Sequence, residues 1–268
     1  MELELNGINA DSLVQMLKAS FTLENWEGIL LIADKLYSEI NAIYNANQRE
    51  RAAAQKVTSF NLRRPVVYYF GYSMSLKGIA MEKKGRYAEA RAAIDKYSDL
   101  SWIEGMDAAG VAEVEYYQQI AKANRYVIDL NEGNTDIIPD YIAFLRINEQ
   151  ELLLGLISIL KAAINFKYNV DEILNEFQEK MSAMAVYYET QRIVRYYNDY
   201  IYLKAKYYSI IGKTYDSINT LLLSLTSSVK LNDNTGFRKS VALFENLRAE
   251  STASQLGEYK LLMQQLLA

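Results

Sequence analysis

The residues best suited to holding a ligand are charged and aromatic side chains that recur along one stretch: Arg192, Arg195, Asp199, Tyr202 and Lys206. Their intervals of three or four residues place side chains on a single face of an α-helix. Arginine holds a carboxylate through two parallel hydrogen bonds, and tyrosine offers contact area at little cost in entropy. These residues therefore predict a surface that binds a peptide or protein. The alternative is an Arg195–Asp199 ion pair on a solvated helix face.

Catalytic chemistry has little support in the composition. The 268 residues include no Cys and no His, which excludes cysteine nucleophiles, Ser-His-Asp relays and HExxH zinc sites. Carboxylate pairs such as Glu113/Glu115 and Asp171/Glu172 lack a partner motif and are typical of a helix surface. We therefore expect no enzymatic activity, no cofactor and no metal.

Charge and hydropathy limit the classes of partner. The net charge is −4, and the densest basic stretches, 48–56 and 61–65, are short enough to be solvated helix faces. We therefore expect no direct contact with nucleic acid. The longest apolar run, 152–160, is too short to cross a bilayer, and the acidic N-terminus lacks the order of an export signal. These features predict a soluble, cytoplasmic chain without membrane contact.

The elements that must position these residues are helices. Half of the residues are apolar and only 2 are Pro and 12 Gly, which favours an all-α fold. Capping residues, Pro and Gly mark the helix ends, and no linker separates domains. We predict one domain over 1–268, with residues 234–268 as its cap. The predicted helices are a short one capped by Asp11, then 24–46, a weaker segment to 60, 65–84, 87–98, 108–131, 136–147, 149–166, 170–181, 185–211, 214–230, 234–249 and 254–267.

Long and shorter helices alternate across tight turns, which predicts repeated helical hairpins. In the stretch KGIAMEKKGRYAEARAAI (77–94), Gly78 and Ala90 are small residues where two helices cross, and Gly85 makes the turn. Residues 202–222 repeat this pattern, which is that of the tetratricopeptide repeat, although the turns are unevenly spaced along the chain. We predict a right-handed superhelical array of tetratricopeptide-like hairpins, an α-solenoid of roughly 11 to 13 helices.

Residues 64–107, followed by 120–134, resemble the helical-repeat halves of Gram-positive bacterial transcriptional regulators. Those regulators join an N-terminal helix-turn-helix to a tetratricopeptide-like sensor domain, and several respond to short signalling peptides. The resemblance implies a sensor domain that binds a short peptide or a protein. Because repeat-like helices begin near residue 10, the chain is either the sensor half of a longer protein or has no DNA-binding role.

Tetratricopeptide arrays bind partners along an inner wall that the first helix of each hairpin lines. Transferred to this chain, the pattern points the face that carries Asp199 inward and also selects four earlier residues: Tyr72, Ser75, Tyr116 and Asn124. Asn124 would offer a donor and an acceptor to an extended peptide. A hydrogen bond from Asn124 to a neighbouring helix is the alternative, and most of the 22 Tyr are expected in the core.

Three other interpretations stay open. The array could be a scaffold for a constitutive protein partner, without a small ligand. It could be a helical phosphatase of the kind that some tetratricopeptide regulators contain, which the lack of His disfavours. The leucine-rich C-terminal helix at 258–268 either caps the last hairpin or forms the contact of a homodimer.

Overall fold

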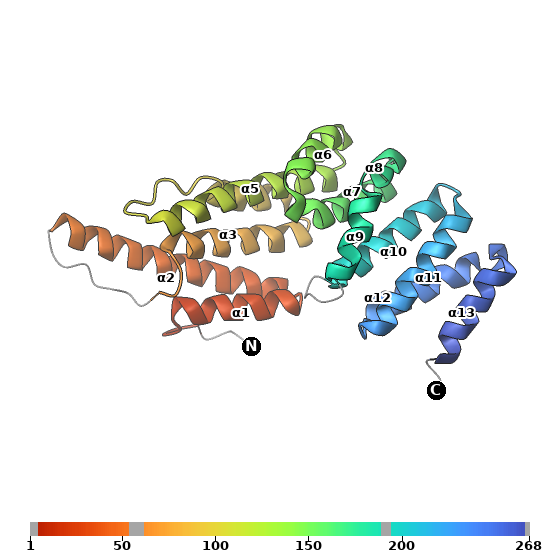
Figure 1. Cartoon of the computed structure of the whole chain (residues 1–268). Helices are drawn as coiled ribbons and strands as arrows, with labels where there is room; N and C mark the ends of the chain where they lie inside the picture. The colour runs from red at the N-terminus through yellow and green to blue at the C-terminus, as the bar shows by residue number, and fades with distance from the viewer. Residues whose placement is uncertain (1–4, 54–61, 189–193, 266–268) are drawn as a thin grey trace. The chain divides into compact units, whose positions relative to one another are not determined.

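A computed structural model describes residues 5–53, 62–188 and 194–265 (Figure 1). Within these ranges the chain forms thirteen α-helices and no strand, which confirms the predicted all-α class. Contacts between residues divide the chain into two compact units, Met1–Ile128 and Asp129–Ala268, which are described separately. The single repeat domain and its C-terminal cap stay predictions. None of the helices in the described ranges is long and apolar enough to span a membrane.

The N-terminal unit begins with two capped helices. The cap of the first is Asn9, whose Oδ1 accepts a hydrogen bond from the Ser12 N–H at 2.9 Å; the predicted cap, Asp11, was wrong and lies in the first turn. Asn25 caps the second helix at the predicted place. This second helix runs beyond its predicted end. The helices of the unit are α1 (Ala10–Thr22), α2 (Trp26–Ala52), α3 (Val66–Lys83), α4 (Tyr87–Tyr97) and most of α5 (Ala108–Asn131).

Helices α3 and α4 form the hairpin that the repeat pattern predicts. Pro65 directly precedes α3, and Gly85 makes the turn with a φ of +71°, a conformation that favours glycine. A methyl group on Gly78 would lie 3.6 Å from the Ala90 carbonyl oxygen, so the two helices cross closely there. Gly71 is more constrained, because a methyl group would overlap the ring of Tyr117 on α5.

The core of the N-terminal unit includes a group of aromatic rings around Phe70, which is fully buried. The centroid of its ring lies 5.2 Å from that of Tyr37, 6.2 Å from that of Tyr44 and 5.3 Å from that of Trp102, and all three contacts are edge-on. Trp102 and the buried Ile103 belong to the connection between α4 and α5. This connection therefore packs against α2 and α3 and shapes the surface beside them.

The C-terminal unit contains shorter helices. The predicted helix at 170–181 is interrupted at Phe177, whose ring is buried, whereas the helix at 214–230 has its predicted bounds. The predicted helix at 185–211 includes residues 189–193, which lie outside the described ranges. The helices are α6 (Ile138–Ile147), α7 (Leu152–Phe166), α8 (Asp171–Glu176), α9 (Gln178–Tyr188), α10 (Val194–Ile210), α11 (Thr214–Lys230), α12 (Asn234–Leu247) and α13 (Ala253–Gln265).

Helices α10 to α13 share one hydrophobic cluster, in which Phe244 of α12 stacks on Tyr259 of α13 with 3.9 Å between ring centroids. Small hydroxyls join the neighbouring helices. Ser217 of α11 donates a hydrogen bond to the Ala205 carbonyl of α10 at 2.8 Å. Because a serine side chain is so short, this bond requires close approach of the two backbones.

Candidate functional site

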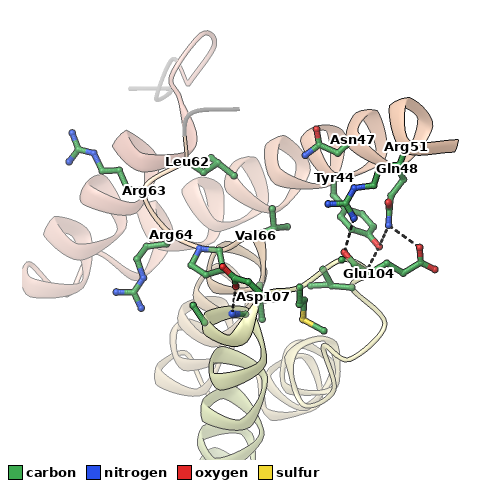
Figure 2. A pocket seen from close by; sticks show the side chains of 17 residues that line it. Tyr44, Asn47, Gln48, Arg51, Leu62, Arg63, Arg64, Val66, Glu104 and Asp107 are labelled. Carbon is green, nitrogen blue, oxygen red and sulfur yellow. Dashed lines mark hydrogen bonds between the residues drawn. The ribbon is translucent and has the colours of Figure 1, made fainter. Parts of the chain in front are cut away.

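A cleft of about 480 Å³ opens in the N-terminal unit, where α2 ends and α3 and α5 begin (Figure 2). Its lining comes from three segments of the chain, 44–51, 62–67 and 103–110. The volume lies within the range of about 300–1,000 Å³ that is typical of small-ligand sites. Apolar residues share the lining with charged ones, which are Arg51, Arg63, Arg64, Glu104 and Asp107.

Helix α2 supplies the polar side of the cleft. Tyr44, Gln48 and Arg51 follow one another at intervals of four and three residues and therefore share one face of the helix. The Tyr44 hydroxyl accepts hydrogen bonds from Gln48 Nε2 at 2.8 Å and from the Glu104 N–H at 3.1 Å. Gln48 Nε2 also lies 3.3 Å from Glu104 Oε2. These bonds hold the connection before α5 against α2.

Gly105 brings this connection close to Arg51. Its φ is +69°, and a methyl group on Gly105 would overlap the Arg51 guanidinium. Arg51 Nη1 lies 3.5 Å from the carbonyl oxygen of Glu104, and Figure 2 shows its side chain directed from α2 toward this connection. The glycine therefore leaves room for a guanidinium at the edge of the cleft.

Arg64 lines the cleft and also contacts the first of several neighbouring tyrosines on α3 and α5. Its guanidinium donates a hydrogen bond to Glu113 of α5, and this bond raises the pKa of Arg64. The same group lies 4.7 Å from the centroid of the Tyr68 ring, in a cation–π contact. Tyr68 stacks on Tyr72 one turn further along α3, with 5.3 Å between centroids. The Tyr117 hydroxyl of α5 donates to the Tyr68 carbonyl at 3.1 Å.

The structure places the four site residues predicted on α3 and α5 in this unit. Tyr72 is partly buried, and burial, followed by the nearby phenols of Tyr68 and Tyr116, raises its pKa. Tyr116 is half-exposed. Ser75 is buried, and its hydroxyl donates to the Tyr72 carbonyl at 3.1 Å. Tyr72 and Tyr116 are therefore brought together, whereas Ser75 has little exposed surface.

Asn124 makes the bond that the sequence left as its alternative role. Its Nδ2 donates to the hydroxyl of Tyr97 on α4 at 2.8 Å. The Tyr97 ring is fully buried, and burial raises its pKa. Asn124 therefore connects α5 to α4; contact with a peptide stays a prediction.

The other predicted site residues lie on α10 of the C-terminal unit, except that Arg192 is outside the described ranges. Asp199 Oδ1 lies 4.0 Å from Lys239 Nζ of α12, and this ammonium is 6.0 Å from the centroid of Tyr202. Arg195 is exposed and Lys206 is partly buried. The face thus carries the predicted charges, and Lys239 joins it from α12. Its role in binding stays a prediction.

The residues of the cleft were not among the predicted site residues. Arg51, Arg63 and Arg64 lie in the two basic stretches that we assigned to solvated helix faces. The high density of basic residues in these stretches is the feature of the sequence that could have indicated the cleft. The position of Glu104, more than fifty residues further along the chain, came only from the folding of the connection onto α2.

The described part of the chain contains no group of three or more Asp and Glu that could hold a metal ion. A comparison with protein-family models, curated proteins and solved structures finds no match for the chain. The chemistry of the residues that line the cleft therefore has to indicate which kind of ligand it binds.

Proposed function

We propose that the chain is a right-handed array of tetratricopeptide-like hairpins that binds a short peptide or a protein and catalyses no reaction. The observation that carries this proposal is the cleft of about 480 Å³, which combines apolar walls with hydrogen-bonding groups. An extended peptide requires both, because its backbone needs polar partners while its side chains bury apolar surface. The α3–α4 hairpin supports the repeat architecture.

In this proposal the chain is the cytoplasmic sensor part of a bacterial transcriptional regulator and does not contact DNA itself. Neighbouring repeats of a helical array depend on one another for their packing. A peptide that binds one state of the array more tightly than another would shift its curvature or its self-association as a homodimer. An attached or separate DNA-binding module would respond to that change.

Selection from a library of random short peptides, displayed on phage with free C-termini and panned against the full chain, tests the binding function. We expect enrichment of peptides that bind the purified chain in calorimetry. A parallel selection against Arg51→Gln identifies the peptides that use the cleft. Failure to enrich any peptide above a helical control protein, together with a pull-down that returns no partner, would contradict the proposal.

The regulatory role has its own measurement. Sedimentation of the chain with and without a selected peptide should show a change in association or in sedimentation coefficient. Identical sedimentation, with unchanged small-angle scattering, would leave a binding domain but contradict a conformational sensor.

A further inference from the structure

The cleft differs in charge from the chain as a whole. Three arginines and two carboxylates line it, in a chain whose net charge is −4. One of the three, Arg64, already donates to Glu113. Arg51 makes no ion pair within the described ranges, and its 3.5 Å contact with the Glu104 carbonyl is at the limit of a hydrogen bond. Most of the five N–H donors of Arg51 therefore stay available.

Further donors face the same space. The Tyr44 hydroxyl accepts two hydrogen bonds, and its own proton has no acceptor among the residues that the structure describes. Val66 and Val67 line the cleft in the first turn of α3, a helix whose N-terminus has no side-chain cap. Their N–H groups and the positive end of the helix dipole favour a negative group.

An acceptor also lies in the lining and constrains the ligand further. Asn47 Oδ1 is buried, and none of the described residues gives it a hydrogen bond. A buried carbonyl oxygen without a donor is unfavourable by about 1–3 kcal/mol. A ligand that brings an N–H to Asn47 would remove this cost.

We infer that the cleft binds the oxyanion of a ligand that also carries a neighbouring N–H, as the carboxylate end of a peptide does. Arg51, Tyr44 and the first turn of α3 donate to the oxyanion, and Asn47 accepts from the N–H. This inference rests on the proposed function and specifies which part of the peptide the cleft holds.

Small probes test the recognition directly. The ¹⁵N-labelled full chain is titrated separately with N-acetylglycine, N-acetylglycinamide and acetate, while its amide and side-chain NMR signals are followed. N-acetylglycine should shift the signals of Val66, Val67, Gly105, the Arg51 side chain and the Asn47 side-chain amide. The neutral amide should leave them nearly unchanged. Acetate should bind more weakly, because it has the carboxylate but no hydrogen-bond donor for Asn47.

Two results of these titrations would overturn the inference. Equal shifts with the acid and the neutral amide would show that charge is not recognised. Acetate that binds as tightly as N-acetylglycine would show that Asn47 does not accept a hydrogen bond from the ligand. Signals that move only elsewhere would place the probe outside the cleft, with the same consequence.

Variants separate an anion site from a cation site by the sign of their effects. Arg51→Gln should weaken the binding of N-acetylglycine roughly tenfold, the value of a charged hydrogen bond. Glu104→Gln should strengthen it, because a carboxylate beside the bound oxyanion is removed. Arg49→Gln is the matched control, since Arg49 is exposed on α2 and does not line the cleft. The reverse pattern, in which Arg51→Gln strengthens the binding of N-acetylglycine and Glu104→Gln weakens it, would contradict the inference.

Circular dichroism would reveal whether Arg51→Gln folds. If it does not, the effect of Glu104→Gln on the binding of N-acetylglycine still shows whether the cleft binds anions or cations. Failure of this inference is also distinct from failure of the proposed function. Selected peptides that bind equally well with amidated C-termini, and equally to the Arg51→Gln chain, would leave peptide binding intact and overturn only the inference.

Discussion

Side-chain hydrogen bonds join neighbouring helices differently in the two units. In the N-terminal unit tyrosine phenols reach across: Tyr69 of α3 donates to Asp11 of α1 at 2.5 Å, and Tyr117 of α5 donates to a carbonyl on α3. In the C-terminal unit serines form such bonds: Ser217 of α11 donates to the Ala205 carbonyl of α10, and Ser224 of α11 lies 2.9 Å from Ser240 of α12. Long side chains span wider gaps between helices than hydroxymethyl groups do. The first region should therefore suffer most from truncation, and the second from enlargement.

Truncation at the centre of the aromatic group should have the largest effect. Phe70→Ala removes a fully buried ring that contacts three others, so we expect a loss of about 3–5 kcal/mol in unfolding free energy. Denaturant titration measures the loss, and hydrogen exchange should locate it in Met1–Ile128. The exposed Leu223→Ala is the control and should change stability by less than about 0.5 kcal/mol. A loss under 1 kcal/mol for Phe70→Ala would contradict the role of the rings.

Enlargement between α10 and α11 should come next. Ser217→Val adds bulk at a fully buried position and should cost about 1–3 kcal/mol. Ser217→Ala removes only the hydroxyl and should cost about 1 kcal/mol. The difference between the denaturation midpoints of the two variants isolates the steric part of the stability loss from the part due to the lost hydrogen bond. Equal midpoints would show that the backbones have room to spare and that the comparison between the units does not hold.

Alkaline pH should lower the unfolding free energy by a smaller amount, through the buried phenol of Tyr69. Burial, with the hydrogen bond to Asp11, raises the pKa of Tyr69 to about 12. Because the folded state prefers the neutral phenol, the contribution of Tyr69 is fully present below about pH 10 and is lost as the pH rises through 12. Unfolding free energy should therefore fall over this interval, and less steeply in Tyr69→Phe. Parallel pH profiles of the two proteins would be evidence against this assignment.

The smallest effect is expected on the surface of α10. Asp199 and Lys239 are both about half-exposed and 4.0 Å apart, so Asp199→Asn should change stability by less than about 0.5 kcal/mol. This variant separates the two candidate surfaces when peptide binding is measured alongside. Binding that survives Asp199→Asn but not Arg51→Gln would favour the cleft. The reverse would favour the predicted face of α10.

The helices were largely predictable because their signals are local. Asn25, Pro65, Gly85 and Gly212 stand at helix ends in the structure as the sequence indicates. The misplaced cap at Asp11 is an error of two residues, because Asn9 and Asp11 are both residue types that cap helices well. The break at Phe177 was missed because a buried ring at the junction of two helices resembles one more apolar position of a helix.

The site was less predictable, because spacing along a helix tells which side chains share a face and not what covers that face. The sequence by itself determined the all-α class, most helix bounds and the shared faces of α2 and α10. Only the tertiary structure placed Glu104 beside Arg51 and Glu113 beside Arg64. Those pairs are about fifty residues apart in the chain. The first pair depends on how a connection without regular structure packs against α2, and the second on how α5 packs beside the start of α3. Local periodicity encodes neither.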